Sequence, residues 1–348
     1  MDFAARTDVH NHIVPPVWAE TLAARGLNSG GWAIPAWSPA SALAMMGQQG
    51  IATGVMSVTS PGVHLGDDAV ARDLARAVNE YGAEVVKDHP DRFGHFAGIP
   101  LPDIDAAVAE AVYALDVLGA DGVVLMSNAH GKYLGDPDLE PLWAELDRRA
   151  ANVLVHPAQP PMELLPGTPA PLADYVLDAT RTALNMVLNG VMDRYRNVRV
   201  LLSHGGGFLP YAAFRFSGLT STVVDRTRKA EDILRDLKCF YFDTALFASP
   251  TPASPADPAP SGAHLTAAKC RCAPHRRCGA STRGTGRSRS GAPAETLFVP
   301  GPRDAPGPGE AVPVRPERCR IDQLRHERVR GRTLLAFTPS ARPDRSPR

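Results

Sequence analysis

Four histidines stand at the ends of short apolar runs, where their imidazoles could bind one metal ion. His10 and His12 close the first run. His156 and His204 close two later ones. Alternate residues of a β-strand point to the same side, so His10 and His12 can reach a common ion. Neutral imidazole suits zinc and its neighbours, and three protein ligands with one open position are typical of a catalytic site.

A metal ion at such a site supports more than one reaction. Zinc lowers the pKa of bound water to about 7, so a hydrolase can use the resulting hydroxide. A nonoxidative decarboxylase instead needs a protonated substrate carbon and stabilisation of the developing charge. A nearby histidine can manage the proton. The ligands alone therefore leave open whether the enzyme releases carbon dioxide or cuts an ester, a lactone or an amide.

The elements that position these histidines alternate along the first 250 residues. Apolar runs rich in β-branched residues are each followed by an amphipathic stretch, which is typical of βα units around a parallel sheet. The predicted strands are 6–12, 53–59, 93–99, 122–127, 153–156, 198–204 and 239–244. In a (β/α)8 barrel all strand carboxyl ends open onto one face, so the histidines would converge there. We predict an α/β fold, a TIM-barrel-like (β/α)8 fold with its eighth strand missing.

Two helices have predicted ends, and one long segment lacks a clear period. Asp67 and Asp103 precede periodic apolar residues, and Gly82 and Gly119 are the expected stops. The segment 15–41 is rich in Trp, Gly and Pro and is predicted to be a long loop over the first strand.

The other histidines of this region carry less information. We expect them to be solvated or capping groups in or near loops, with His130 as a candidate substrate contact. They are His64, His89, His95 and His130.

The charge distribution divides the chain near residue 250. The whole chain has 37 basic and 37 acidic residues, but residues 1–250 hold 19 and 29, whereas residues 251–348 hold 18 and 8. The later segment also has 15 of the 33 prolines and only 12 Leu, Ile, Val and Phe residues, too few for a buried core. We predict an incomplete barrel domain over 1–249 and a disordered Pro- and Arg-rich tail over 250–348. A reading-frame shift in a GC-rich gene is one hypothesis for the break.

Composition also bears on partners and location. A net charge of zero argues against nucleic-acid binding driven by phosphate attraction. No run of 18 apolar residues exists, and the first residues lack the apolar region of a secretory signal. We therefore expect no nucleic-acid partner, no membrane partner and a cytoplasmic location.

Three motifs together resemble the amidohydrolase superfamily. They are DVHNH from Asp8, HP at His156 and SHGGGFLPY from Ser203. The stretches SPGVHLGDD from Ser60, HPDRFGHFAGIPLPD and DGVVLMSN are closer to its decarboxylase branch, which includes aminocarboxymuconate-semialdehyde and 6-methylsalicylate decarboxylases. The resemblance covers about residues 6–249.

The resemblance implies a role for each matching residue. His10, His12 and His156 match metal ligands, with Zn²⁺ as the expected ion. His204 matches the histidine that acts on the metal-bound water. Arg215 matches an arginine that reaches the substrate carboxylate of a neighbouring subunit, which implies a homodimer. The branch favours a carboxy-lyase that acts on a small aromatic or unsaturated carboxylic acid, such as a substituted salicylate, over a hydrolase.

One family ligand has no counterpart in the sequence. The family places an aspartate of a Gly-Ser-Asp motif after an eighth strand, and no such motif follows Ser249. Asp243, in the sequence FDTA, is expected to support the site rather than to bind the metal. A further alternative is therefore an inactive remnant that binds metal poorly.

Overall fold

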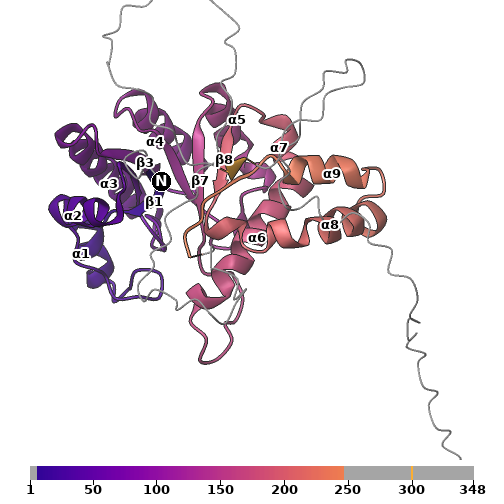
Figure 1. The fold of residues 1–348 in the computed structure, drawn as a ribbon, viewed down its shortest axis with the longest axis horizontal. Coiled ribbons are helices and arrows are strands. Elements are labelled where there is room, and N and C mark those ends of the chain that lie inside the picture. Colours follow the sequence, from indigo (N-terminus) through magenta and orange to yellow (C-terminus); the bar gives the residue numbers. More distant parts are fainter. Residues whose placement is uncertain (1–5, 247–298, 301–348) are drawn as a thin grey trace, which may run out of the picture. The chain divides into compact units, whose positions relative to one another are not determined.

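A curled parallel sheet forms the centre of the molecule. The computed structural model describes residues 6–246 and 299–300. Its parallel strands, in order of pairing, are β1 (Thr7–His12), β2 (Thr53–Ser57), β3 (Phe93–Gly98), β4 (Gly122–Met126), β7 (Asn152–His156), β8 (Arg199–Leu202) and β9 (Tyr241–Phe242) (Figure 1). Each strand pairs in parallel with the next. The seven predicted strands and the barrel-type α/β fold are confirmed.

Three short strands complete the described sheets. β10 (Val299–Pro300) pairs antiparallel with β9, and β5 (Asn128–Ala129) pairs antiparallel with β6 (Lys132–Tyr133) in a separate hairpin. The prediction of a missing eighth parallel strand, and that of a disordered tail over 250–348, fall outside the described residues apart from β10. Both stay predictions.

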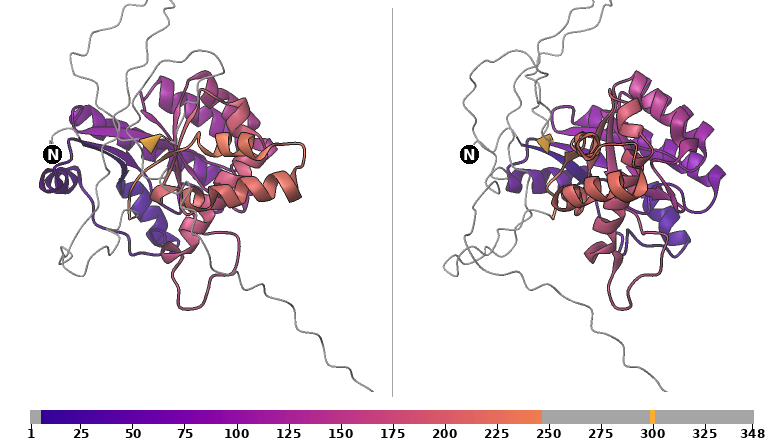
Figure 2. Two further views of the ribbon diagram at one scale, coloured as in Figure 1. Left: turned by 45° about the vertical axis from the view of Figure 1, so that its right-hand side comes forward. Right: turned by 90° about the vertical axis from the view of Figure 1, so that its right-hand side faces the viewer.

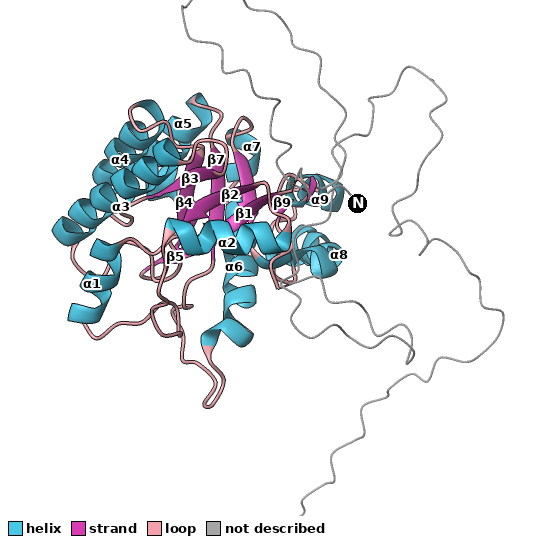
Figure 3. Ribbon diagram, turned by 60° about the vertical axis from the view of Figure 1, so that its left-hand side comes forward, coloured by secondary structure: helices cyan, strands magenta, loops and turns pink. Residues whose placement is uncertain are grey.

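Helices follow most strands and pack against the sheet and against one another. They are α1 (Pro16–Ala24), α2 (Pro39–Gln49), α3 (Asp68–Asp88), α4 (Ile104–Asp116), α5 (Glu140–Arg148), α6 (Asp174–Leu188), α7 (Val191–Arg194), α8 (Leu209–Leu219) and α9 (Ala230–Leu237). α3, α4 and α5 lie side by side (Figure 3), and α8 lies against α9 (Figure 2). Asp103 caps α4 as predicted, but the helix ends three residues before Gly119. No helix within 6–246 has both the length and the apolar character of a membrane span.

The predicted end of α3 is wrong for a physical reason. The helix begins after Asp67, whose side chain accepts the Val70 amide N–H as expected, but it continues through Gly82 to Asp88. A Cβ atom at Gly82 would come within 2.6 Å of the His95 ring on β3. Glycine therefore serves a close contact between α3 and β3 here and does not end the helix.

The predicted long loop over 15–41 is also wrong, because α1 and the start of α2 lie inside it. Trp18 and Leu22 are one helical turn apart and fully buried. The indole Nε1 of Trp18 donates to the carbonyl oxygen of Gly62 at 2.7 Å, which satisfies its one polar group. Only residues 25–38 remain as a connection without a helix.

Alternate residues of one strand pack into two different cores. On β7, Val153 and Val155 pack in a cluster with side chains of α4, α5 and α6. Leu154 belongs to a second cluster, with Val124 of β4. His156 is two residues beyond Leu154 and so shares its side of the strand. The packing of the strand thus sets the direction in which His156 points.

Candidate metal centre

The four histidines at the strand ends come together. The ring centroid of His10 lies 4.8 Å from that of His12, 5.2 Å from that of His156 and 4.9 Å from that of His204. One donor atom from each of His10, His12 and His156 lies within 4.8 Å of the other two. Residues 146 positions apart in the sequence, His10 and His156, thus offer imidazole nitrogens to one point.

β1 presents two of these rings on one side. Its buried and partly exposed residues alternate along the whole strand, and His10 and His12 share the partly exposed side. The pairing of β1 with β2 shifts register between Asp8 and Asn11. The Asp8 carboxylate accepts hydrogen bonds from the His10 amide N–H at 3.1 Å and from Asn11 Nδ2 at 3.3 Å. The Asp8 carboxylate therefore makes its hydrogen bonds to residues of its own strand.

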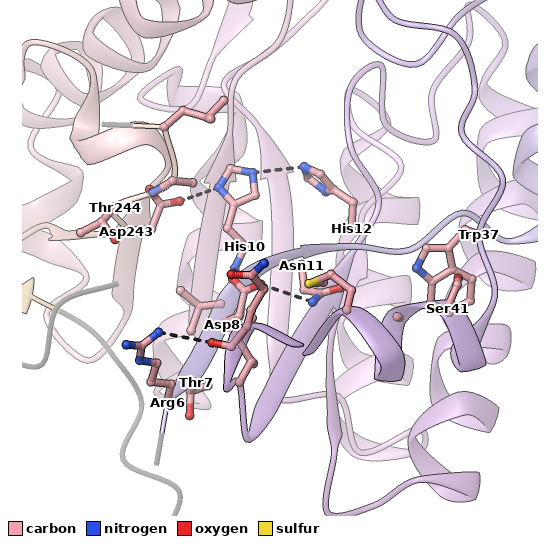
Figure 4. Close-up of a pocket in the computed structure, with 17 residues that line it drawn as sticks. Arg6, Thr7, Asp8, His10, Asn11, His12, Trp37, Ser41, Asp243 and Thr244 are labelled. Atoms are coloured by element: carbon pink, nitrogen blue, oxygen red, sulfur yellow. Dashed lines mark hydrogen bonds and ion pairs between the residues drawn. The ribbon is translucent and has the colours of Figure 1, made fainter. Parts of the chain in front are cut away.

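The imidazole of His10 has a partner on each side. Its Nδ1 lies 2.6 Å from Oδ2 of Asp243, and its Nε2 lies 3.1 Å from Nε2 of His12 (Figure 4). Nδ1 of His12 lies 3.3 Å from the carbonyl oxygen of Ser57. A carboxylate or carbonyl oxygen only accepts, so each Nδ1 carries a hydrogen. Each Nε2 then has a lone pair for an ion when the ring is neutral.

The other two histidines follow the same rule. Nδ1 of His156 donates to the carbonyl oxygen of Pro157 at 2.9 Å, and Nδ1 of His204 donates to that of Ala245 at 3.0 Å. Such partners fix the tautomer and the orientation of a ligating imidazole. The donor set therefore fits a divalent transition metal.

Burial keeps three of the four rings neutral. Burial, with a smaller contribution from charge on His10, lowers the pKa of His12 to about 3. Burial also holds the pKa of His156 well below its usual value and lowers the pKa of His204. His10 differs, because the Asp243 carboxylate outweighs the effect of burial and raises its pKa. At neutral pH the lone pairs needed for a metal are thus available on His12 and His156, two of the three candidate ligands.

The glycine run after His204 is required by close packing. Gly205, Gly206 and Gly207 all have positive φ values, between 63° and 74°. A Cβ atom on Gly206 would come within 2.5 Å of the Phe242 ring, and one on Gly207 within 2.1 Å of a carbonyl oxygen of α6. Only glycine therefore fits the backbone at these positions.

Asp243 and Arg215 occupy very different places. Asp243 is 3% exposed, and its Oδ1 accepts the amide N–H of Ala245 at 3.1 Å while Oδ2 holds His10. This arrangement agrees with the expected supporting role. Arg215 is exposed on α8, with the exposed rings of Tyr211 and Phe214 on the same helix. It does not meet the four histidines within this chain.

A cavity of about 380 Å³ borders the histidine pair of β1. It is lined by His10, His12 and Asp243 together with residues of α2 and residues 244–246 (Figure 4). Oγ1 of Thr244 is buried there without a hydrogen-bond partner among the described residues. Among the described residues, the His10 side of the centre thus borders a cavity large enough for a small molecule.

Of the other four histidines, His95 differs from the prediction, whereas His130 is exposed in a turn as expected. His95 is neither solvated nor capping but lies 2% exposed in β3, where burial lowers its pKa to about 4. Its position inside a predicted strand was the available signal. His64 and His130 hydrogen-bond to each other, 66 residues apart, and no local pattern signals that pair. His89 is the C-terminal cap of α3, as expected.

Comparisons with known proteins agree with these features. A family model of amidohydrolases matches residues 7–270. The decarboxylase yanB of Aspergillus niger is 38% identical over 254 residues, which is 69% of this chain and 69% of that protein. The 6-methylsalicylic acid decarboxylase of Penicillium expansum is 36% identical over 255 residues, 71% of this chain and 78% of that protein. A crystal structure described as an amidohydrolase II superposes with a TM-score of 0.63 at 32% identity, over 68% of this chain and 78% of that one. The chain belongs to the amidohydrolase family, in the branch of the decarboxylases.

Proposed function

We propose that this chain is a metal-dependent nonoxidative decarboxylase of a hydroxylated aromatic carboxylic acid such as a substituted salicylate. The observation that carries the proposal is the convergence of His10, His12 and His156, each with its other ring nitrogen held by an acceptor. The names of the decarboxylases to which the chain is similar supply the substrate class. In this reaction the bond from ring to carboxylate breaks, carbon dioxide leaves, and a proton takes its place on the ring carbon.

His10, His12 and His156 would hold the divalent ion, and Zn²⁺ is the specific ion that we propose. When bound, such an ion supplies a Lewis acid that stabilises negative charge on substrate oxygens. Manganese and other divalent ions use the same donors, so the imidazole set alone does not select zinc. Asp243 would orient His10 and increase its basicity through their 2.6 Å contact.

His204 is the proposed proton carrier. Its Nδ1 is engaged by the carbonyl oxygen of Ala245, so Nε2 is the atom that can take up and release a proton. Burial and the neighbouring His10 lower its pKa, which makes the protonated ring a stronger acid than a solvated imidazolium. A stronger acid transfers its proton more readily to a ring carbon, which is a weak base.

The partner proposal concerns α8. Tyr211 is 94% exposed and Phe214 is 77% exposed, and Val223 and Val224 continue the apolar surface beyond the helix. Exposed aromatic side chains grouped in this way are typical of interfaces. We propose a homodimer through this surface, with Arg215 reaching the substrate carboxylate of the neighbouring copy. A cytoplasmic location is likewise proposed.

The experiment follows both products. Purified full-length chain, loaded with Zn²⁺ or Mn²⁺, is incubated with salicylate and 6-methylsalicylate, and released carbon dioxide and the phenol are measured. We expect 3-methylphenol from 6-methylsalicylate, and no product from the matched variant His156→Ala. Turnover of a lactone without carbon dioxide release would instead favour the hydrolase alternative, and inactivity of the loaded chain toward both would favour an inactive remnant.

A further inference from the structure

A second cavity lies on the face where the metal-centre strands end. It measures about 530 Å³ and is lined by residues that follow β2, β3, β4 and β7. Met126 of β4, in its wall, is the register partner of His156 on β7. Much of the wall is apolar, with Val63, Ile99, Leu101, Met126 and Leu164 among its side chains. Its position and its walls suit an aromatic ring bound beside the metal centre.

A row of three polar side chains reaches the wall of this cavity. Oδ1 of Asp68, at the start of α3, lies 2.8 Å from Nε2 of His64. Nδ1 of His64 in turn lies 2.6 Å from Nε2 of His130, with the two rings nearly perpendicular. The side chain of Asp68 is 58% exposed and that of His64 is 11% exposed. His130, which lines the cavity, is itself exposed, so both ends of the row are within reach of solvent.

The donors around this row decide where its hydrogens lie. The Asp68 carboxylate only accepts, so His64 carries its hydrogen on Nε2. The Gly66 amide N–H points at Nδ1 of His64 at 3.3 Å, which makes that nitrogen an acceptor. His130 must then donate from Nε2, and its Nδ1 keeps a lone pair. Burial and charge on His64 lower the pKa of His130, which keeps this ring neutral at neutral pH.

The hairpin that carries His130 is fixed at both strands. His130 and Gly131 form the two-residue turn between β5 and β6, both with positive φ, as in a tight hairpin turn. The buried carboxylate of Asp178 on α6 accepts from Nδ2 of Asn128 at 2.7 Å and from the Tyr133 hydroxyl at 2.6 Å. His130 is therefore held in place before any ligand binds.

Two neighbouring polar groups of the wall already have partners. The hydroxyl of Tyr175 donates to the carbonyl oxygen of Gly30 at 2.9 Å, and Oδ1 of Asn128 accepts the Gly131 amide N–H at 3.0 Å. Nδ1 of His130, by contrast, has no hydrogen-bond partner within 6–246. Because His130 lines the cavity, this acceptor is available to a hydrogen-bond donor of a ligand bound there.

We propose that the cavity binds the ring of a hydroxylated aromatic acid and that Nδ1 of His130 accepts a hydrogen bond from the ring hydroxyl. His130 would thus select hydroxylated acids over the same acids without a hydroxyl, because an unsubstituted ring leaves the acceptor desolvated and unpaired. The inference rests on the proposed function for the class of acid and adds the residue that recognises its hydroxyl.

The test measures binding rather than turnover. Dissociation constants of benzoate and of 2-, 3- and 4-hydroxybenzoate are determined by calorimetry for the full chain. We expect at least one hydroxybenzoate to bind about tenfold more tightly than benzoate. His130→Gly keeps a residue suited to positive φ and should abolish this preference. His130→Asn keeps both the turn and an acceptor oxygen and should retain part of it.

His89→Ala, which removes a histidine remote from the cavity, is the control and should leave the preference unchanged. Circular dichroism checks that each variant is folded. An equal preference in the wild-type chain and in His130→Gly, or no preference in the wild-type chain, would overturn the inference. If the preference behaves as expected but no carbon dioxide is released from any hydroxybenzoate, the proposed reaction fails while the binding role of His130 stands.

Discussion

Two clusters in this chain repeat one arrangement in different surroundings. In both, a carboxylate holds one nitrogen of a histidine whose other nitrogen faces a second histidine, as in Asp243–His10–His12 and Asp68–His64–His130. The first lies beside two more imidazoles, and its carboxylate is 3% exposed. In the second cluster the carboxylate is 58% exposed. There the Gly66 amide N–H also donates to Nδ1 of His64, the nitrogen that faces His130.

The groups around each carboxylate–histidine–histidine cluster determine what the cluster can bind. Around His10, additional lone pairs converge and a buried carboxylate supports the charge of an ion. Around His64, the Gly66 N–H occupies the nitrogen that a metal would need, so only one acceptor is left, on His130. We therefore infer a metal centre in the first case and a hydrogen-bonding group in the second.

The largest expected effect separates the clusters by metal content. His12→Ala removes one of three imidazoles and should weaken zinc binding by roughly a hundredfold or more, since even supporting residues contribute 10- to 100-fold. His64→Ala should leave zinc binding unchanged. Metal content after dialysis against a graded chelator series measures both. Equal metal loss in the two variants would contradict the distinction between the clusters.

His95 is a buried histidine whose ring has no carboxylate partner, and it adds a third case to the comparison. The pKa of His95 is lowered to about 4 in the folded chain, against about 6.5 when unfolded, so the unfolded state binds more protons between these values. The stability from this group is complete above pH 6.5 and should fall by about 3 kcal/mol as the pH drops to 4. Urea unfolding of the wild-type chain and of His95→Leu at several pH values measures it. The variant should lack this part of the pH dependence, and identical slopes would refute the assignment.

Changing each carboxylate tests the supporting role directly. Asp243→Asn removes the charge beside His10 and should weaken zinc binding by about 10- to 100-fold. Asp68→Asn, the same change in the other cluster, should not alter zinc binding. Competition with a chromogenic chelator gives both affinities. Retained affinity in Asp243→Asn would mean that the His10 contact does not support a ligand.

The smallest expected effect concerns the same Asp68→Asn variant. The amide can no longer stabilise the His64 tautomer as a carboxylate does, but its oxygen still accepts a hydrogen bond. The preference for a hydroxybenzoate over benzoate should fall by roughly threefold, less than in His130→Gly. Calorimetry with the same ligands measures it. A loss larger than that in His130→Gly would contradict the order of roles in the row.

Much of the framework could be predicted from the sequence. Buried parallel strands are continuous apolar runs, so all seven were found, and the ends of β2, β3 and β4 lie within two residues of their predictions. The four histidines could be placed together because parallel strands bring their carboxyl ends to one face. That inference needs only the strand order and no side-chain detail.

Contacts between distant segments could not be predicted. Gly82 carries the same local signal whether it ends a helix or makes room for His95, and only the packing of α3 on β3 decides. The pairing of His64 with His130 depends on a hairpin anchored by Asp178, which is about 50 residues later in the chain. α1 was not predicted because it begins with two prolines and has only two buried residues, Trp18 and Leu22.

The central claim, that His10, His12 and His156 form a metal centre, is tested most directly by X-ray absorption at the zinc edge on the zinc-loaded full chain. The account predicts about three imidazole nitrogens at roughly 2.0–2.1 Å from the ion. In His156→Ala the imidazole count should fall to two, whereas in His64→Ala it should stay at three. A coordination shell without imidazole, or one that His156→Ala leaves unchanged, would contradict the account.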